Sequence, residues 1–460
     1  MLPDPKLVPE DVMAVLRGLR AAHKQAWLAG GAVRDLVRGK IAQDFDVATD
    51  ALPEQVLRLF ARVIPTGVQH GTVTVLSGTH SVEVTTFRGE GPYLDGRRPS
   101  SVHFLGEIEG DLSRRDFTVN AMAWDPLNGI LRDPFGGEED LRRKRLRAVG
   151  NPLDRFREDG LRPLRAVRFA CTLRLAIEPR TLRAVSQSLD VFEKVAMERV
   201  RDELLKLLVR GEPPSRGLRL LLRTGLLRRI APELIEGVGF VQNRYHAWDV
   251  WRHTLHTVDA APPELLARLA ALLHDVAKPR TAAPKEGAPG EHTFYDHEHV
   301  GARLTAAMLQ RLKLPKRDIE RVALLVDEHN WHYLPEWTDA TVRRTLSRIG
   351  KEELPLLWAL RRADLTARGR YVEEGLRNQA EAEARFAREL ERASALKITD
   401  LQIGGEDVMQ ALGIGPGRAI GQVLSRLLDR VLEHPELNSR ETLLRLVPEV
   451  AEKPSTGNSQ

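Results

Sequence analysis

The alternation of apolar and polar residues predicts two neighbouring strands in the N-terminal part of the chain. Val73 and Val75 alternate with polar residues, and so do Val82 and Val84. This period of two is typical of a strand with one buried face. Residues 77–79, Ser-Gly-Thr, separate the two runs and signal a turn. The pattern therefore predicts a hairpin within a sheet.

The same alternation around residue 45 predicts a strand with two carboxylates on one face. Phe45 and Val47 are apolar, whereas Asp44 and Asp46 are acidic. Successive side chains of a strand point to opposite faces, so the two aspartates share a face. Glu83 lies on the polar face of the second predicted strand and is a candidate third carboxylate. A turn followed by a solvated acidic strand is the alternative interpretation.

Beyond residue 150 the apolar pattern becomes helical. Leu204, Leu205, Leu207 and Leu208 recur at the spacing of one helix face. Glycine and proline clusters interrupt later helices. The sequence predicts an α+β N-terminal region, whose mixed sheet carries helices, followed by three all-α regions. We expect these regions at 1–150, 151–245, 246–380 and 381–460, the last with a disordered C-terminal end.

Composition narrows the class of protein without defining its activity. The 460 residues include 69 Lys and Arg against 64 Asp and Glu, a net charge of +5. Such a bias permits RNA binding through counterion release but does not require it. Cys171 is the only cysteine, which excludes an intramolecular disulfide and fits a cytoplasmic location. We expect no membrane association, because no apolar run is long enough to span a bilayer.

Phosphate-binding residue types flank the predicted carboxylates. Gly30 and Gly31 would let the backbone approach a phosphate closely, and Arg34 would neutralise its charge. Arg114 and Arg115 suit a triphosphate, because guanidinium groups bind phosphate oxygens in pairs. Together with the carboxylates they predict a site for two Mg²⁺ ions. One ion would activate an attacking hydroxyl and the other would steady the leaving phosphate.

The ordered motifs resemble the family of class II tRNA nucleotidyltransferases and bacterial poly(A) polymerases, within the polymerase beta superfamily. They are LAGGAVRD at 28–35, DFDVATD at 44–50, TGVQHGTVTV at 66–75, DLSRRDFTVNAMAWD at 111–125 and REDGLRPLRAVRFA at 157–170. The resemblance implies a polymerase beta-like head and a helical neck. It implies transfer of nucleotides from CTP and ATP to the 3′ end of tRNA, with release of pyrophosphate. It also assigns Asp116 and Asn120 to the nucleotide site.

The last of these motifs contains candidates for base recognition. An ionised Asp159 offers only acceptors and Arg162 only donors, so the pair matches the edges of cytosine and adenine. The family resemblance implies this template role, with Arg165 and Arg168 alongside. The alternative is a helix ribbed with salt bridges, in which Glu158 pairs with Arg162. Pro163 predicts that this helix begins nearer residue 160 or bends at 163.

A second group of metal-ligating residue types lies further along the chain. The residues are His253, His274, Asp275, His297, His329 and Asp364. Such a set suits a metal that activates water for phosphoester hydrolysis. The spacing resembles the HD phosphohydrolase superfamily, which implies a divalent transition metal or Mg²⁺. His299 makes the third position ambiguous, although the residues that follow favour His297.

Alternative functions remain open at this point. A poly(A) polymerase of the same fold would carry a basic, Phe-containing variant of TGVQHGTVTV. A specialist for CC or for the final A is another alternative. A loop is predicted at 89–101, and its Tyr93, Asp95, Arg97 and Arg98 favour full CCA addition by resemblance. A remote alternative is an HD phosphohydrolase with a nucleotide-sensing N-terminal region. The expected partners are the tRNA 3′ end, CTP and ATP.

Overall fold

The computed structural model describes residues 2–90, 102–288, 290–331 and 333–451. The chain divides into two compact units, Met1–Ile235 and Glu236–Gln460. Tyr93, Asp95, Arg97 and Arg98 of the predicted loop lie outside the described residues, as does the segment 452–460. The boundaries expected after residues 150, 245 and 380 remain predictions.

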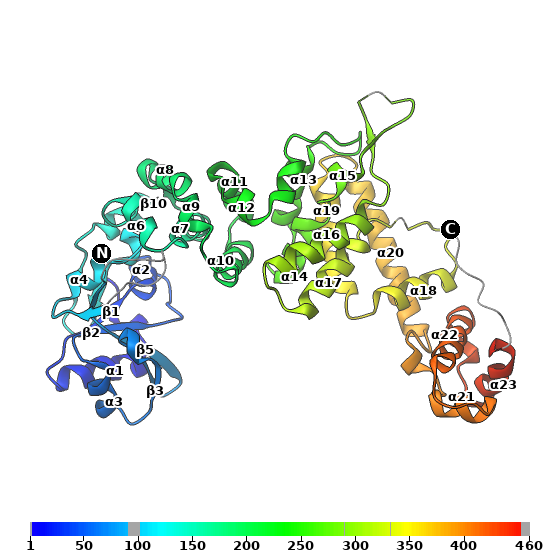
Figure 1. Ribbon diagram of the computed structural model, residues 1–460, viewed down its shortest axis with the longest axis horizontal. Helices are drawn as coiled ribbons and strands as arrows, with labels where there is room; N and C mark the ends of the chain where they lie inside the picture. The colour runs from blue at the N-terminus through cyan, green and yellow to red at the C-terminus, as the bar shows by residue number, and fades with distance from the viewer. Residues whose placement is uncertain (1, 91–101, 289, 332, 452–460) are drawn as a thin grey trace. The chain divides into compact units, whose positions relative to one another are not determined.

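A seven-stranded mixed sheet organises the first unit (Figure 1). The strands β2 and β5 pair in parallel, and the other neighbours pair antiparallel. The predicted hairpin corresponds to β4 and β5. In spatial order the strands are β3 (Val63–Gly67), β4 (Thr72–Ser77), β5 (His80–Thr86), β2 (Asp46–Thr49), β1 (Ala26–Ala29), β8 (Ala123–Asp125) and β9 (Ile130–Arg132).

Alternating side chains of this sheet enter two separate cores. Val47 and Val84 pack in one core with α1 (Glu10–Ala21) and α2 (Gly31–Val37). Ala48 packs in the other core with Ile108 and Leu112 of α4 (Ile108–Ser113). This alternation leaves the side chains at the N-terminal end of β2 on the face opposite Val47.

Helices follow the sheet within the first unit. Leu204, Leu207 and Leu208 form the buried side of α10, as their spacing predicts. The helices are α6 (Pro152–Glu158), α7 (Arg162–Thr172), α8 (Pro179–Gln187), α9 (Leu189–Phe192), α10 (Met197–Arg210), α11 (Pro214–Thr224) and α12 (Leu226–Ile230).

The second unit is helical apart from a small hairpin, β12 (Ala283–Pro284) and β13 (His292–Thr293). The predicted fold class, a mixed-sheet head followed by helical regions, is confirmed. Among the described residues, no helix is both long and apolar enough to cross a membrane. The main helices are α13 (Val250–Ala260), α14 (Leu265–Leu273), α16 (His297–Arg311), α17 (Lys316–Asp327), α18 (Asp339–Ile349), α19 (Leu354–Ala367), α20 (Val372–Arg392), α21 (Gly405–Leu412), α22 (Arg418–Glu433) and α23 (Arg440–Ala451).

Candidate active sites

The predicted carboxylates meet at one end of β2. The parallel register pairs Asp46 with Glu83 of β5. Asp44 was expected inside the same strand, but β2 begins at Asp46 and Asp44 is exposed just before it. The physical reason is the partner strand. Ala29, the last residue of β1, pairs with Asp46, and the chain then turns at Gly30 into α2.

Electrostatics at this end of the sheet fit a bound cation. Burial raises the pKa of Asp46, and the negative charges of Glu83 and Asp44 raise it further, against the opposing charge of Arg115. Carboxylates that repel one another in this way are stabilised by a divalent ion between them. The donor set is all oxygen, which is the ligand type that Mg²⁺ prefers.

Gly30 has a backbone and surroundings that exclude a side chain. Its φ is +71°, which L-residues rarely adopt. A Cβ atom there would lie 2.6 Å from Nη1 of Arg115. Arg114 and Arg115 are both fixed by Asp111, at 2.7 and 3.1 Å. Burial alone would raise the pKa of Asp111, but the charges of Arg115 and Arg114 outweigh it and lower that pKa.

Asp111 was not predicted, although its position three and four residues before the two arginines on a helix was a usable signal.

Other predicted residues of the first unit are connected to one another by hydrogen bonds and an ion pair. Arg34 donates to Oδ1 of Asn120 at 2.7 Å, and Asn120 donates to Asp116 at 3.0 Å. Asp116 in turn pairs with Arg165 at 2.7 Å. Burial would raise the pKa of Asp116, but Arg165 and Asn120 outweigh it and lower the pKa to about 2.

Three arginine side chains lie around the ring of Phe169. The sequence analysis did not identify Phe169 as a candidate site residue. The guanidinium carbons of Arg34, Arg165 and Arg168 lie 5.4, 5.2 and 3.8 Å from the ring centre. Arg168 also pairs with the buried Glu203 of α10. Each cation is thus held by a carboxylate or an amide and by the aromatic face.

The base-reading candidates flank a helix break. The alternative interpretation, one helix that carries both Glu158 and Arg162, does not hold, because α6 ends at Glu158 and α7 begins at Arg162, near the start that Pro163 predicts. Pro163 follows directly in the first turn, where a missing N–H costs no hydrogen bond. Glu158 and Arg162 nevertheless form an ion pair across the break. Asp159 pairs with Arg199 of α10 at 2.8 Å, a partner that the sequence did not predict.

One pocket of about 460 Å³ brings most of these groups together. Asp44 and Glu83 do not line it. The predicted residues that do are Gly30, Gly31, Arg34, Asp46, Arg114, Arg115, Asp116, Asn120, Asp159, Arg162, Arg165 and Arg168.

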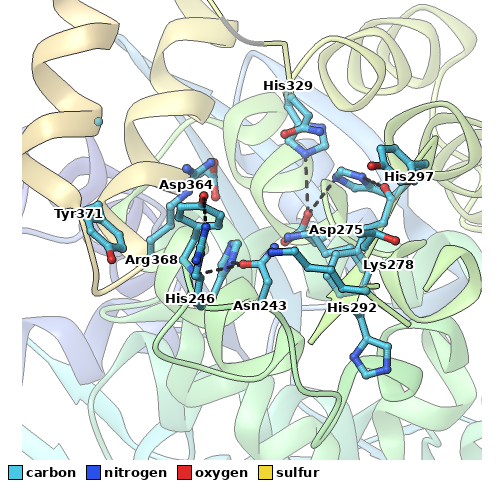
Figure 2. A pocket seen from close by; sticks show the side chains of 18 of the residues that line it. Asn243, His246, Asp275, Lys278, His292, His297, His329, Asp364, Arg368 and Tyr371 are labelled. Carbon is cyan, nitrogen blue, oxygen red and sulfur yellow. Dashed lines mark hydrogen bonds and ion pairs between the residues drawn. The ribbon is translucent and has the colours of Figure 1, made fainter. Parts of the chain in front are cut away.

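The second unit contains the other predicted cluster, which surrounds Asp275 (Figure 2). Oδ2 of Asp275 lies 3.2 Å from Nε2 of His274. Oδ1 of Asp275 lies 3.6 Å from Nε2 of His297 and 3.7 Å from Nε2 of His329. Nε2 of His253 lies 3.0 Å from Asp364. Asp275 therefore belongs to two sets of possible ligand atoms, and within each set all the atoms lie within 4.8 Å of one another. The sets are His253–His274–Asp275 and Asp275–His297–His329.

The hydrogen bonds around this cluster fit a bound metal. Nδ1 of His274, His297 and His329 each contacts a backbone carbonyl oxygen, at 2.9, 2.7 and 2.7 Å. This arrangement directs each Nε2 toward Asp275, and Nε2 of His274 also lies 3.2 Å from Nε2 of His253. Oδ1 of Asp275 and Nε2 of His297 are buried without a hydrogen-bond partner among the described residues, whereas Oδ2 of Asp275 lies 2.8 Å from Nζ of Lys278. His299, in contrast, is exposed and contacts Asp327 at 2.7 Å.

Burial suppresses protonation of His297. It lowers the pKa of His297 to about 3, and the charges of His329 and Lys278 contribute. Burial would raise the pKa of Asp275, but His274 and Lys278 outweigh it and hold that pKa well below its usual range. Neutral imidazoles and an ionised carboxylate are the forms that bind metals.

His246 was missed by the sequence analysis. It joins His253 and Asp364 in a third set of ligand atoms within 4.8 Å, and its Nδ1 lies 3.0 Å from Oδ1 of Asn243. Burial, with the charge of Lys278, lowers the pKa of His246 to about 2. A cavity of about 880 Å³ is bordered by His246, Asp275, His297, His329 and Asp364, but not by His253 or His274. His246 lies outside any helix, so no periodicity marked it.

Three family models match successive parts of the chain. The Poly A polymerase head domain matches residues 26–147, and the probable RNA and SrmB-binding site of polymerase A matches residues 174–237. The HD domain matches residues 244–373. The A-adding tRNA nucleotidyltransferase of Deinococcus radiodurans is 38% identical over 427 residues, which are 88% of this chain and 91% of that protein.

Other relatives match in different ways. The CCA-adding enzyme of Levilactobacillus brevis is 46% identical over 217 residues, 47% of this chain and 54% of that enzyme. This chain thus spans about half the length of the curated CCA-adding relatives it matches. The crystal structure of the Bacillus stearothermophilus CCA-adding enzyme in complex with CTP has a TM-score of 0.69 and 28% identity. The structural match covers 96% of this chain and 96% of that enzyme's chain.

The extent of the Deinococcus match shows the family. The chain belongs to the tRNA nucleotidyltransferases with a poly A polymerase head domain, and it also carries an HD domain. The family resemblance drawn from the sequence motifs is confirmed.

Proposed function

We propose that this protein builds or repairs the 3′-terminal CCA of tRNA, using CTP and ATP and releasing pyrophosphate. The observation that carries the proposal is the shared pocket of the first unit. It is lined at once by the carboxylate Asp46, by the phosphate-binding candidates and by Asp159 and Arg162. Cys171, the only cysteine of the sequence, is compatible with the cytoplasmic location that such a role requires.

In this proposal Asp44, Asp46 and Glu83 hold two Mg²⁺ ions, which would activate the tRNA 3′ hydroxyl and neutralise charge on the phosphates. The backbone at Gly30 and Gly31 approaches the triphosphate, because no side chain intervenes. Arg34, Arg114 and Arg115 bind its oxygens, with Asp116 and Asn120 holding Arg34 in place. The 3′ oxygen bonds to the α-phosphorus while the bond to pyrophosphate breaks.

Base selection would fall to Asp159 and Arg162. Arg199 and Glu158 hold this pair at the pocket wall, and Arg162 also donates to the backbone oxygen of Arg114 at 2.9 Å. A carboxylate accepts from the amino groups of cytosine and adenine and repels the carbonyl of uracil. Arg165 and Arg168, whose guanidinium groups lie against the ring of Phe169, would support the selected base.

A specialist that adds only the final A is the second candidate. The Deinococcus relative, named as A-adding, aligns along most of this chain, whereas the CCA-adding relatives align along about half. The solved CCA-adding enzyme with CTP, which covers 96% of the chain, supports full addition. A poly(A) polymerase is disfavoured by the TGVQHGTVTV segment.

The deciding experiment uses tRNA substrates that end at the discriminator base, at C and at CC. Each is incubated with labelled CTP, ATP or both, and the products are sized. We expect all three substrates to reach CCA when both nucleotides are present. Extension of only the CC-ending tRNA would identify an A-adding enzyme. Repeated addition of A would identify a poly(A) polymerase.

We also propose that the second unit hydrolyses phosphoesters at a metal centre of Mg²⁺ or a divalent transition metal. The proposed ligands are His253, His274, Asp275, His297, His329 and Asp364. Oδ1 of Asp275 and Nε2 of His297, which are buried without a hydrogen-bond partner among the described residues, support this function. The bound metal would supply an activated water for attack on phosphorus.

A further inference from the structure

The pocket of the first unit contains one apolar side chain among many charged groups. Of the described residues that line it, only Phe169 carries an apolar side chain. This residue belongs to α7 and is 6% exposed. The face of an aromatic ring carries negative potential, so a ring surrounded by guanidinium groups can hold them electrostatically.

Three arginines of this pocket lie around the ring. The guanidinium carbon of Arg168 is 3.8 Å from the ring centre, and those of Arg165 and Arg34 are 5.2 and 5.4 Å away. All three distances fall within the roughly 6 Å over which a ring face attracts a cation. Arg165 and Arg168 belong to α7, whereas Arg34 belongs to α2. The ring therefore gathers cations from two separate helices.

Arg165 and Arg168 repel each other, and their shared carboxylate offsets that repulsion only in part. Both pair with Glu203 of α10. Burial lowers the pKa of Arg168, and the charge of Arg165 lowers it further, against the opposing charge of Glu203. A lowered pKa means that the surroundings disfavour the charged form of this arginine. The negative face of Phe169 offsets part of this cost without adding another titratable group.

Phe169 is itself held in place by other aromatic rings. Its ring centre lies 5.7 Å from that of Phe117, at an interplanar angle of 76°. The ring of Phe117 in turn lies 6.4 Å from that of Phe156, at an angle of 64°. Both are edge-to-face arrangements, which aromatic pairs favour. Because Phe117 and Phe156 are fully buried, these contacts give the ring of Phe169 a rigid support.

We propose that Phe169 is a positioning residue for nucleotide addition, whose ring holds Arg34, Arg165 and Arg168 close together before the nucleotide arrives. This inference rests on the proposed nucleotide addition in the same pocket. Arginines that are already in place bind an anionic nucleotide without first being ordered, which strengthens binding. The ring acts through these arginines and not on the reacting atoms. Its contribution therefore falls on binding of the nucleotide and not on the chemical step.

The test weakens the negative face of the ring while keeping its shape nearly unchanged. In the full chain, Phe169 is replaced by difluorophenylalanine or trifluorophenylalanine, whose fluorines withdraw electrons from the ring face. KM is measured for CTP with tRNA that ends at the discriminator base, and for ATP with tRNA that ends at CC. We expect both KM values to rise stepwise, to about tenfold in the trifluoro variant, the effect of losing a desolvated cation–π contact. We expect kcat to stay within about threefold, and the preference for CTP over UTP to be unchanged.

Trifluorophenylalanine in place of Phe156 is the matched control. Phe156 is fully buried in the same row of rings, and among the described residues no cation lies over its ring. KM should stay within about twofold in this variant. An equal rise of KM there would show that the fluorines act through packing, which would overturn the proposal. Unchanged KM in the Phe169 series, or a fall of kcat without a rise of KM, would overturn it as well.

Failure of nucleotide addition itself is distinguishable from failure of the role of Phe169. If the wild type extends none of the tRNA substrates, the proposed addition is wrong. Titration calorimetry of CTP and of ATP with Mg²⁺ then decides the present inference. A stepwise loss of affinity in the Phe169 series, but not in the Phe156 variant, supports the role of the ring, and equal affinity in all variants overturns it. A wild type that binds neither nucleotide overturns both proposals.

Discussion

The two pockets differ in how completely the oxygens of their buried carboxylates are paired. In the first unit every strongly buried carboxylate has its guanidinium partner, as in the pairs of Asp116 with Arg165 and Asp111 with Arg114. In the second unit Oδ2 of Asp275 pairs with Nζ of Lys278 at 2.8 Å, but Oδ1 is buried without a hydrogen-bond partner among the described residues. Paired carboxylates leave the outer cations of the first pocket available to an anionic ligand, whereas the unsatisfied Oδ1 can still accept a cation.

The difference extends to protonation. The pKa of Asp116 is lowered to about 2, because its cationic and amide partners outweigh burial. The pKa of His297 is lowered to about 3, because burial disfavours the imidazolium. Both groups are therefore unprotonated at neutral pH, Asp116 as a paired anion and His297 as a neutral imidazole. In the proposed functions, pairing would suit the first pocket to phosphates and burial would suit the second to a metal.

The largest expected effect comes from the carboxylates of the first pocket. In Asp46→Ala we expect nucleotide addition to fall by at least about 10³-fold, since loss of a shared metal ligand removes several kcal/mol of transition-state stabilisation. Phosphoester hydrolysis by the second unit should not change. Labelled CTP incorporation and phosphate release are measured on the same preparation, with circular dichroism as the control for folding.

Asp44→Ala extends this test, because Asp44 is exposed and lies outside both β2 and the pocket wall. An equally large loss of addition would establish it as a ligand despite its position. Near-normal addition by both variants would remove the basis for the proposed chemistry.

The reciprocal change is His274→Ala/Asp275→Ala in the second unit. We expect metal-dependent hydrolysis to disappear, because Asp275 belongs to two of the three sets of ligand atoms. CCA addition should remain within about threefold, since its chemistry lies in another unit. Loss of addition in a folded variant would show that the two pockets are coupled, and the contrast drawn above would no longer hold.

Much of this contrast could be predicted from local patterns. The two-residue alternation at Val82 and Val84 located β5, and the histidine and aspartate spacing located the second cluster. The failures occurred where distant chain segments decide the outcome. Asp44 fell outside β2 because β1 ends opposite Asp46, and no signal within 44–47 reports the length of the partner strand.

Contacts between residues that lie far apart in the sequence could likewise not be predicted. Arg199 holds Asp159 from a helix 40 residues away, and Tyr371 meets Tyr245 from another distant segment. His246 lies in a loop, where periodicity gives no information. Sequence patterns identified reactive residue types, but the residues that orient them depend on tertiary packing.

A smaller effect is expected for base selection. In Asp159→Ala the preference for CTP over UTP should decrease by about 10- to 100-fold, the effect of one or two charge-assisted hydrogen bonds. Arg199→Ala is the matched variant, because it frees Asp159 without removing it. We expect an intermediate loss of preference there. Relative kcat/KM for CTP and UTP on tRNA provides the measurement, and unchanged preference in both variants would return the motif to a salt-bridged structural role.

The smallest effect tests whether the first pocket is stabilised by its pairing. Asp116 accepts from Arg165 at 2.8 Å through Oδ2 and from Asn120 at 3.0 Å through Oδ1. Its pKa of about 2 lies below the unfolded value of 3.8, so ionisation stabilises the folded state above pH 4 and this contribution is lost as the pH falls toward 2. At pH 7 we expect Asp116→Asn to lower the free energy of unfolding by about 1–3 kcal/mol. The difference between the wild type and Asp116→Asn should shrink to about half at pH 3, because the unfolded carboxyl is then mostly protonated. Urea unfolding of both proteins between pH 7 and pH 3 measures this change. A difference that does not vary with pH would mean that Asp116 stabilises through packing, and the pairing attributed to the first pocket would then contribute little to its stability.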